Sequence, residues 1–353
     1  MFIRVRPTAN LYLLGSSQIG RTLVVIHGTQ MHAYSPMSRG DLLALKRLAT
    51  SGDANTMTPA IKWLVDIGIA ELGQAPLHRS GAWTGEASRQ IASYSLHAGI
   101  EAAPLIDARI RKSRALIVGV GGIGCNVAQQ LLLMGVKKFV LLDPDRVEAS
   151  NLNRQVLFSR SDIGLKKVDA AAAYMRSRAS PTSLDIQIID EDFLDWHPTR
   201  SELSDISLAI ISADGDPSGI RKKASRDFFS ARVPHAFAAY SGTTGIVGPL
   251  IWRFDSGCGL CKHHVIDASA TLTPVRGPAL LNIPPSSTTT NSILSSLLVD
   301  SWVKSIVNSP DYPSRISFDT LKLRTRRERM RRVLGCPVCD VTPNRQLKDN
   351  TST

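Results

Sequence analysis

Long apolar runs are absent from this 353-residue sequence. No segment approaches the ~18 consecutive apolar residues that cross a bilayer, and the N-terminus, MFIRVRPTAN, lacks the apolar stretch and small-residue cleavage site of a signal peptide. We therefore expect no membrane partner and a cytoplasmic location. Aromatic residues make up only 6% of the chain, yet 43% of its residues are hydrophobic, which suffices for one large domain and a small one.

Cysteine is also scarce, and its spacing argues against a disulfide framework. Five cysteines are present, and four of them form two Cys-x-x-Cys pairs. Thiolates at this spacing are typical of tetrahedral zinc, and a redox pair is the alternative. Four sulfur ligands leave no coordination position for a substrate, so the site would be structural. The predicted Zn2+ ligands are Cys258, Cys261, Cys336 and Cys339.

Acidic residues are outnumbered, which gives a formal net charge of +12 and a strongly basic run at 322–335. Such a run invites a nucleic-acid partner, but it contains no aromatic side chain on which bases could stack. We therefore expect no nucleic-acid partner and interpret the run as a solvated face. An excess of Lys and Arg also suits a protein that handles a triphosphate and an acidic peptide.

The N-terminal zone combines short strand-like runs with two helical patterns. Apolar runs at 11–15, 22–28 and 31–35 predict strands, and the patterns at 40–52 and 58–72 predict helices. We interpret this zone as a small α+β unit of winged-helix-like character that binds a peptide; the alternative is that it only braces a dimer.

The rest of the chain alternates apolar strands with helices, which is the pattern of a mostly parallel sheet covered on both faces. The predicted fold class is therefore α/β, Rossmann-like, with the small N-terminal unit attached. The predicted domains are a recognition domain at 1–75, a linker and helix at 76–110, a nucleotide-binding domain with the zinc site at 111–343, and a disordered tail at 344–353.

A glycine-rich turn follows the first apolar strand of this sheet. Gly119, Gly121, Gly122 and Gly124 open a helix, so backbone N–H groups can approach a phosphate. Asp143 closes the next strand, where a carboxylate can accept hydrogen bonds from ribose hydroxyls. Both features predict a nucleotide site, and both would also fit an NAD-dependent oxidoreductase.

Two cations behind the turn favour a triphosphate. Arg154 in NLNRQ and Lys167 in DIGLKK follow Asp143 at a spacing that brings them beside a bound nucleotide, where they would stabilise a departing pyrophosphate. Asp214 ends a third apolar run and could hold Mg2+ against phosphate oxygens. The alternative for Asp214 is that it caps the helix that follows.

These motifs together resemble the ThiF and MoeB-type adenylyltransferase superfamily, relatives of the ubiquitin-activating enzymes. The resemblance covers roughly residues 85–340, and NLNRQ behind an acidic strand end is its most specific motif. It implies a homodimer that binds Mg·ATP and joins AMP to a carboxylate. It also implies that Asp143, Asp145 and Asn153 contact the nucleotide, that Arg154, Gln155 and Lys167 contact its phosphates, and that Asp214 binds magnesium. Arg89 would be the arginine that one subunit supplies to the site of its partner.

The separate N-terminal unit makes the arrangement most similar to the microcin C adenylating enzymes of ribosomal peptide-antibiotic pathways. That resemblance implies a precursor peptide as substrate. Alternatives are pantocin-type activation of a glutamate side chain, adenylation of a sulfur-carrier or ubiquitin-like protein, and a non-catalytic peptide-binding scaffold. Cys125 lies at the start of the helix after the glycine turn, where we expect it to pack rather than to carry an acyl group.

Overall fold

The computed structural model describes residues 2–6, 8–14, 21–51, 56–73, 85–179, 184–213, 217–241, 243–254, 257–261, 286–307 and 314–339. Two predictions lie outside these residues: Asp214 and the tail at 344–353. The chain divides into two compact units, one built mainly from residues up to 110 and the other mainly from residues 111 onward.

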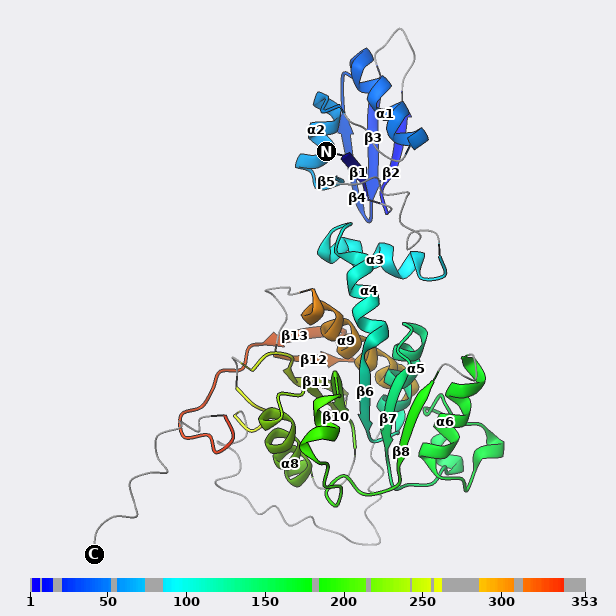
Figure 1. The fold of residues 1–353 in the computed structure, drawn as a ribbon, viewed down its shortest axis with the longest axis vertical. Helices are drawn as coiled ribbons and strands as arrows, with labels where there is room; N and C mark the ends of the chain where they lie inside the picture. The colour runs from blue at the N-terminus through cyan, green and yellow to red at the C-terminus, as the bar shows by residue number, and fades with distance from the viewer. Residues whose placement is uncertain are drawn as a thin grey trace, which may run out of the picture. The chain divides into compact units, whose positions relative to one another are not determined.

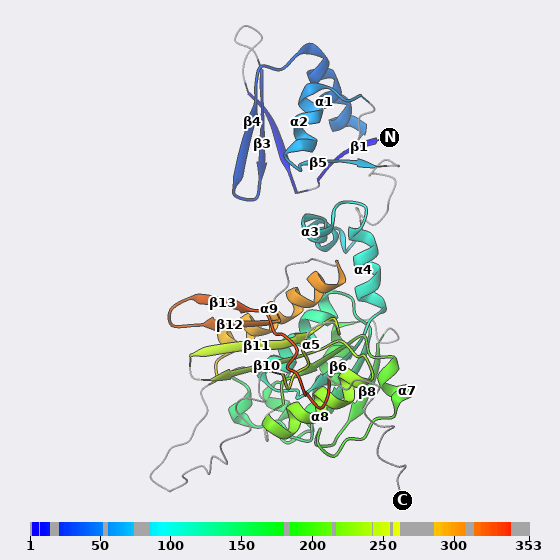
Figure 2. The same ribbon diagram turned by 90° about the vertical axis from the view of Figure 1, so that its left-hand side faces the viewer.

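Strands of the first unit form two antiparallel sheets. β1 pairs with β5, and β2, β3 and β4 form a meander (Figure 2). The meander strands lie where the apolar runs predict them. The strands are β1 (Phe2–Val5), β2 (Asn10–Leu14), β3 (Thr22–His27), β4 (Gln30–Tyr34) and β5 (Ala70–Gly73).

Two helices cover these strands and complete a core of their own. α1 (Arg39–Ser51) and α2 (Pro59–Asp66) bury Leu45, Leu48, Ile61 and Leu64 against residues of β1 and β3. The helix predicted at 58–72 is too long, because the chain turns at Gly68, where φ is +72°, and continues into β5. The helical periodicity of apolar residues does not mark the end of α2, because the residues after the turn are as apolar as those before it.

The segment after residue 84 belongs to the same unit. It forms α3 (Ser88–Ala98) and α4 (Ala103–Lys112). Arg4 of β1 is 3.0 Å from Glu101, and the Glu71 carboxylate on β5 accepts a hydrogen bond from Ile100 N at 2.9 Å. Polar contacts from β1 and β5 therefore fix the loop between α3 and α4.

An eight-stranded sheet forms the centre of the second unit (Figure 1). Its order is β13-β12-β11-β10-β9-β6-β7-β8; the pairs from β10 to β8 are parallel and those from β10 to β13 antiparallel. The mostly parallel sheet is thus confirmed. Its strands are β6 (Arg114–Val118), β7 (Lys138–Leu142), β8 (Asp185–Ile189), β9 (Leu208–Ile211), β10 (His235–Ser241), β11 (Thr244–Ile251), β12 (Arg315–Asp319) and β13 (Arg324–Glu328).

Helices lie on both faces of the sheet, as the unbroken apolar strands predict. Leu116 and Val118 of β6 belong to one buried cluster with Phe228. Ile117 points the other way, and a Cβ on Gly124 would lie 3.2 Å from it. The helices of this unit are α5 (Gly122–Leu133), α6 (Lys167–Arg178), α7 (Arg200–Ser204), α8 (Pro217–Ser230), α9 (Thr288–Ile306) and the short 3-10 helices η3 (Ala149–Asn151) and η4 (Arg160–Asp162).

The hairpin β12–β13 is the part of the sheet that the sequence does not reveal. The run at 322–335, interpreted from the sequence as a solvated basic face, contributes β13, because backbone pairing with β12 does not depend on an apolar pattern. Among the described residues, no helix has the length and apolar character needed to span a membrane.

Candidate nucleotide site and cysteine cluster

A polar cavity of about 630 Å³ opens at the carboxyl ends of β6, β7 and β9. Parallel α/β sheets bind their ligands at this edge. The predicted residues that line it are Gly119, Gly121, Gly122, Asp143, Asp145, Arg154, Gln155 and Lys167. Gly124 and Asn153 are not part of the lining, and Arg89 lies exposed on α3 in the other unit.

The glycine turn is shaped by close backbone contacts. Gly119 has φ +88°, and a Cβ there would lie 2.6 Å from Ala213 N at the end of β9. A Cβ on Gly124 would overlap the carbonyl oxygen of Gly119. Gly121 differs, since the nearest atom to a Cβ there is Gln155 Nε2 at 4.0 Å. The open space lies before the N-terminus of α5, which no side chain caps, and is available to a phosphate.

Asp143 ties the turn to the next strand. Its Oδ2 accepts a hydrogen bond from Val120 N at 2.6 Å, and its Oδ1 accepts one from Asp145 N at 2.9 Å. Burial raises the pKa of Asp143, and the nearby Lys167 ammonium opposes that rise. The carboxylate therefore orients the turn and still offers oxygen lone pairs toward the cavity, as a ribose ligand requires.

Lys167 holds a cation at the wall of the cavity. The residue is 7% exposed, and its Nζ lies 2.6 Å from Asp145 Oδ2 and 3.8 Å from Asp143 Oδ1. Its backbone N donates to Asp145 O at 2.9 Å, so the first residue of α6 is fixed as well as its side chain. The two carboxylates therefore fix the position of this ammonium at the cavity wall.

Arg154 is held by its own loop. Its Nη1 donates to Ser150 O at 2.7 Å and to Asn153 Oδ1 at 3.0 Å. Asn153 thus contacts the arginine rather than the cavity. Gln155 is 4% exposed, and its buried Oε1 has no hydrogen-bond partner among the described residues. The cavity therefore retains unused hydrogen-bonding capacity beside the glycine turn.

Several residues that line the cavity or pack behind its glycine turn belong to no sequence motif. Ser212 Oγ donates to the Gly119 carbonyl at 3.0 Å, which fixes the turn from β9. Asn291 on α9 is fully buried against Gly122, and its Oδ1 has no partner among the described residues. Asp192 and Tyr240 also line the cavity. The position of Asp192 just after β8 is a signal that could have found it.

The thiol of Cys125 is unsuited to nucleophilic chemistry. It is fully buried and donates a weak hydrogen bond to Val120 O at 3.4 Å. Burial raises its pKa to about 12, so the thiolate is not available near neutral pH. The side chain packs behind the glycine turn.

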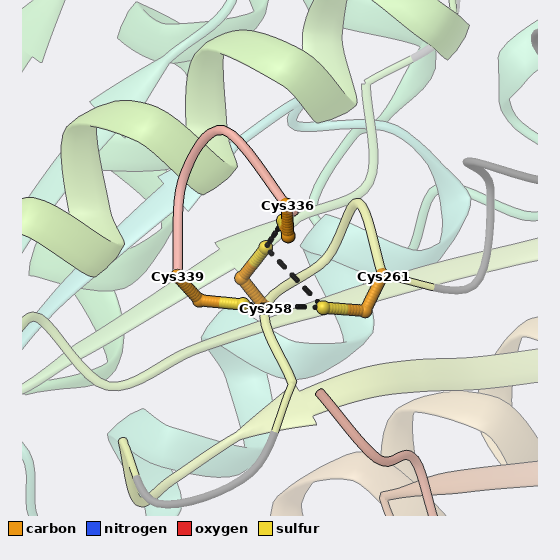
Figure 3. A group of neighbouring side chains, drawn as sticks. All are labelled: Cys258, Cys261, Cys336 and Cys339. Carbon is orange, nitrogen blue, oxygen red and sulfur yellow. Dashed lines mark hydrogen bonds between the residues drawn. The ribbon is translucent and has the colours of Figure 1, made fainter. Parts of the chain in front are cut away.

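Four cysteines converge in the same unit, away from the lining of the cavity (Figure 3). Their sulfur atoms all lie within 4.8 Å of one another, with Sγ–Sγ distances of 3.5 Å for Cys258–Cys336 and 3.2 Å for Cys261–Cys339. A tetrahedral zinc with Zn–S bonds of ~2.3 Å would separate its sulfurs by roughly 3.8 Å, which fits these distances.

The cluster lies in an apolar environment. Leu260 and Met330 pack around the buried sulfurs. Burial raises the pKa of Cys258 and raises that of Cys339 to about 11, so thiolates at these two positions require a compensating cation. The donor set fits zinc and leaves no open ligand position.

Comparison with known proteins gives one family and several relatives. The ThiF family matches residues 88–338. The molybdopterin-synthase adenylyltransferase of Escherichia coli K12 is 27% identical over 239 residues, which cover 65% of this chain and 88% of that relative. The NEDD8-activating enzyme E1 catalytic subunit of Dictyostelium discoideum is 40% identical over 85 residues, 23% of this chain, so the alignment spans only 19% of that subunit's length.

Solved structures share the fold across nearly the whole chain. E. coli MccB, crystallised with AMPCPP and the peptide MccA, superposes with a TM-score of 0.69 over 96% of this chain and 100% of that chain, at 20% identity. A second structure, of the microcin C7 biosynthetic enzyme MccB in complex with N-formylated MccA, gives 0.68 at 19% identity, with 96% and 100% coverage.

The family match extends over the glycine turn, the acidic strand end and the parallel sheet described above. The resemblance to the ThiF and MoeB-type adenylyltransferases is therefore confirmed at the level of the family, which does not depend on any single residue assignment. The chain belongs to the ThiF family.

Proposed function

We propose that this ThiF-family adenylyltransferase uses Mg·ATP to adenylate a carboxylate of a ribosomally made precursor peptide, with release of pyrophosphate. The observation that carries the proposal is one cavity lined by an open glycine turn, by Asp143 and by the cations Arg154 and Lys167. The MccB structures with AMPCPP and with MccA support it by likeness of fold.

The chemistry is an in-line displacement. A carboxylate oxygen of the peptide forms a bond to the α-phosphorus, and the bond from that phosphorus to the bridging oxygen breaks, with both electrons leaving on pyrophosphate. The nucleophile is already ionised near neutral pH, so no general base is needed. The protein contributes position and charge, which are the main sources of catalysis in phosphoryl-type transfers.

Each cavity residue has a proposed role in this step. Asp143 binds the ribose hydroxyls, and the N-terminus of α5 faces a phosphate. Lys167 exchanges part of its contact with Asp145 for phosphate oxygens, and Arg154 and Gln155 neutralise and hydrogen-bond the departing pyrophosphate. Bound Mg2+ would draw charge from the phosphate oxygens, and Asp214, outside the described residues, is its proposed ligand.

In this proposal the first unit recognises the peptide. The protein also forms a homodimer, in which Arg89 reaches the nucleotide bound by the partner subunit. β2 and β4 are the outer strands of the three-stranded sheet, and β2 exposes Tyr12, Leu13 and Leu14. An edge strand with apolar side chains can take an extended peptide as an additional strand. Changing Tyr12 and Leu14 to lysine should raise the KM for the peptide and leave kcat unchanged.

ATP–pyrophosphate exchange tests the function. The DNA beside the gene is first searched for a short reading frame, and the peptide that it encodes is incubated with the protein, ATP, Mg2+ and labelled pyrophosphate. Label should enter ATP only when the peptide is present. Folded protein that binds the peptide and catalyses no exchange would reject adenylation.

A second candidate is activation of a carrier protein at its C-terminal carboxylate. The coverage of 88% of the E. coli molybdopterin-synthase adenylyltransferase favours it. The same exchange assay separates the two, because a folded carrier protein would then support exchange and the short peptide would not. In either case Cys125 is fully buried and is not accessible to an acyl group.

A further inference from the structure

β13 leaves one end of the large sheet open. The strand pairs with β12 on one side, and no strand of the described residues pairs with its other side. A strand in this position presents backbone N–H and C=O groups to an added strand. Figure 1 shows β13 beside β12 at the end of the sheet. We call the open side of β13, together with the arginines of the strand, the β13 edge.

Charge is concentrated at this edge. Residues 322–332 hold seven basic side chains and one carboxylate, a net of +6, which is half of the formal charge of +12 on the chain. All five residues of β13 except Glu328 are exposed. Like charges this close together repel one another, so an anionic partner beside the strand would be attracted to it.

The arginines fall into a defined pattern. Because side chains alternate along a strand, Arg324 and Arg326 share a face with Glu328, and Arg327 lies on the other face. Glu328 contacts Arg315 at 3.1 Å and Arg326 at 3.2 Å, yet the Arg326 side chain stays 79% exposed. Among the described residues, Arg324 and Arg327 have no acidic partner.

A hollow of about 360 Å³ continues the edge where β13 ends. It is lined by Cys261, Arg326, Glu328, Arg329, Met330 and Arg331. Three arginines thus contribute to the lining of a space large enough for a side chain or a chain end, beside an exposed strand.

We infer that the β13 edge binds an extended acidic segment of a peptide by strand addition, with carboxylates at alternate positions opposite Arg324 and Arg326 and no carboxylate opposite Glu328. Backbone pairing would supply affinity, and the arginines would supply selectivity for charge and spacing. The inference deepens the proposed function, on which it rests for the idea that the partner is a peptide.

Two features of the edge favour a peptide over nucleic acid. Residues 320–339 contain no aromatic side chain for base stacking. An open strand edge also pairs with another backbone of N–H and C=O groups, which nucleic acid lacks. If the arginines only keep the edge from aggregating, blocking strand pairing would not change the affinity for an acidic peptide.

Fluorescence anisotropy on the full-length protein, without ATP, tests the inference. The probe is a fluorescein-labelled nine-residue peptide of alternating aspartate and threonine. Charge reversal of Arg324 and Arg326 to glutamate should weaken binding about tenfold, since two attractive pairs become repulsive. The control is Arg176→Glu with Arg178→Glu on α6, the same change in net charge at exposed positions, which should change affinity less than about twofold.

Three further probes decide the mode of binding. The same peptide with N-methyl groups on alternate residues should lose about tenfold in affinity, because strand pairing is blocked while charge is kept. A peptide with contiguous aspartates should bind less well. Equal losses in the edge and control variants, full affinity of the N-methylated peptide, or tighter binding of a single-stranded oligonucleotide of equal charge would overturn the inference.

Folding and function are separated in the same experiment. Equal melting temperatures of the two double variants show that lost binding is not lost structure, and Arg327→Glu alone, on the opposite face, should weaken binding less than Arg324→Glu alone. Pyrophosphate exchange that fails while the probe still binds rejects the proposed function and leaves the β13 edge standing. Pyrophosphate exchange that proceeds while the probe does not bind rejects the inference about the β13 edge and supports the proposed function.

Discussion

The nucleotide cavity and the cysteine cluster are two polar sites in one unit, and they are built in opposite ways. Most of the cavity's motif residues lie between Gly119 and Lys167, and it remains open to a ligand. The cluster joins cysteines 78 positions apart and is packed by apolar side chains. The motif residues of the cavity can therefore be recognised in one continuous stretch, whereas the cluster forms only when distant segments come together in the fold.

The largest effect is expected at Lys167. Lys167→Ala should lower the rate of adenylation by about two to three decades, because one preorganised charge at the transition state is lost. The neighbouring Lys166, which pairs with Asp190 at 2.6 Å on the surface, is the matched control. Steady-state pyrophosphate exchange measures both. If Lys166→Ala lowered the exchange rate as much as Lys167→Ala, a specific role for Lys167 would be contradicted.

Loss of the metal should affect stability instead. The purified protein should contain close to one zinc per chain, and Cys258→Ser should lower the free energy of unfolding by at least about 3 kcal/mol, since metal binding is coupled to folding. Urea denaturation and metal analysis check this, with Cys125→Ser as a control for the loss of a buried thiol. Active, soluble protein without zinc would contradict the comparison between the two sites.

A buried base sharpens the comparison further, because it belongs to neither site. His235 is fully buried, and burial lowers its pKa to about 4 from 6.5. The unfolded chain therefore binds more protons between these values, so stability is complete above pH 6.5 and declines as pH falls toward 4, by about 3 kcal/mol in all. Unfolding at pH 7 and 4.5 should show this loss, and His235→Leu should remove most of it. An unchanged slope in that variant would assign the acid sensitivity elsewhere.

The smallest effect is expected at Cys125. Cys125→Ala removes a thiol that only packs, so adenylation should change by less than about twofold and stability by about 1 kcal/mol. Exchange kinetics and thermal denaturation measure both quantities. A hundredfold loss of activity with an intact fold would show that this cysteine carries an acyl group after all.

Local motifs explain why so much of the cavity is predictable from sequence. The turn at Gly119 and the carboxylate of Asp143 are fixed by strand ends that apolar runs mark clearly. The contact of Asn291 with Gly122 depends on how α9 packs, and no spacing encodes it. The end of α2 could not be predicted, because the turn at Gly68 depends on a positive φ that leaves no periodic signal. The strand β13 could not be predicted either, because it is formed by backbone pairing with β12.

The central claim is that the cavity transfers AMP to a peptide carboxylate, and labelled ATP tests it most directly. The protein would be incubated with the encoded peptide and Mg2+, once with ATP labelled at the α-phosphate and once at the γ-phosphate, and quenched in acid. We predict that the α-label enters the peptide and AMP, while the γ-label leaves as pyrophosphate. Transfer of the γ-label to the peptide, or release of the γ-label as orthophosphate with formation of ADP, would contradict adenylation.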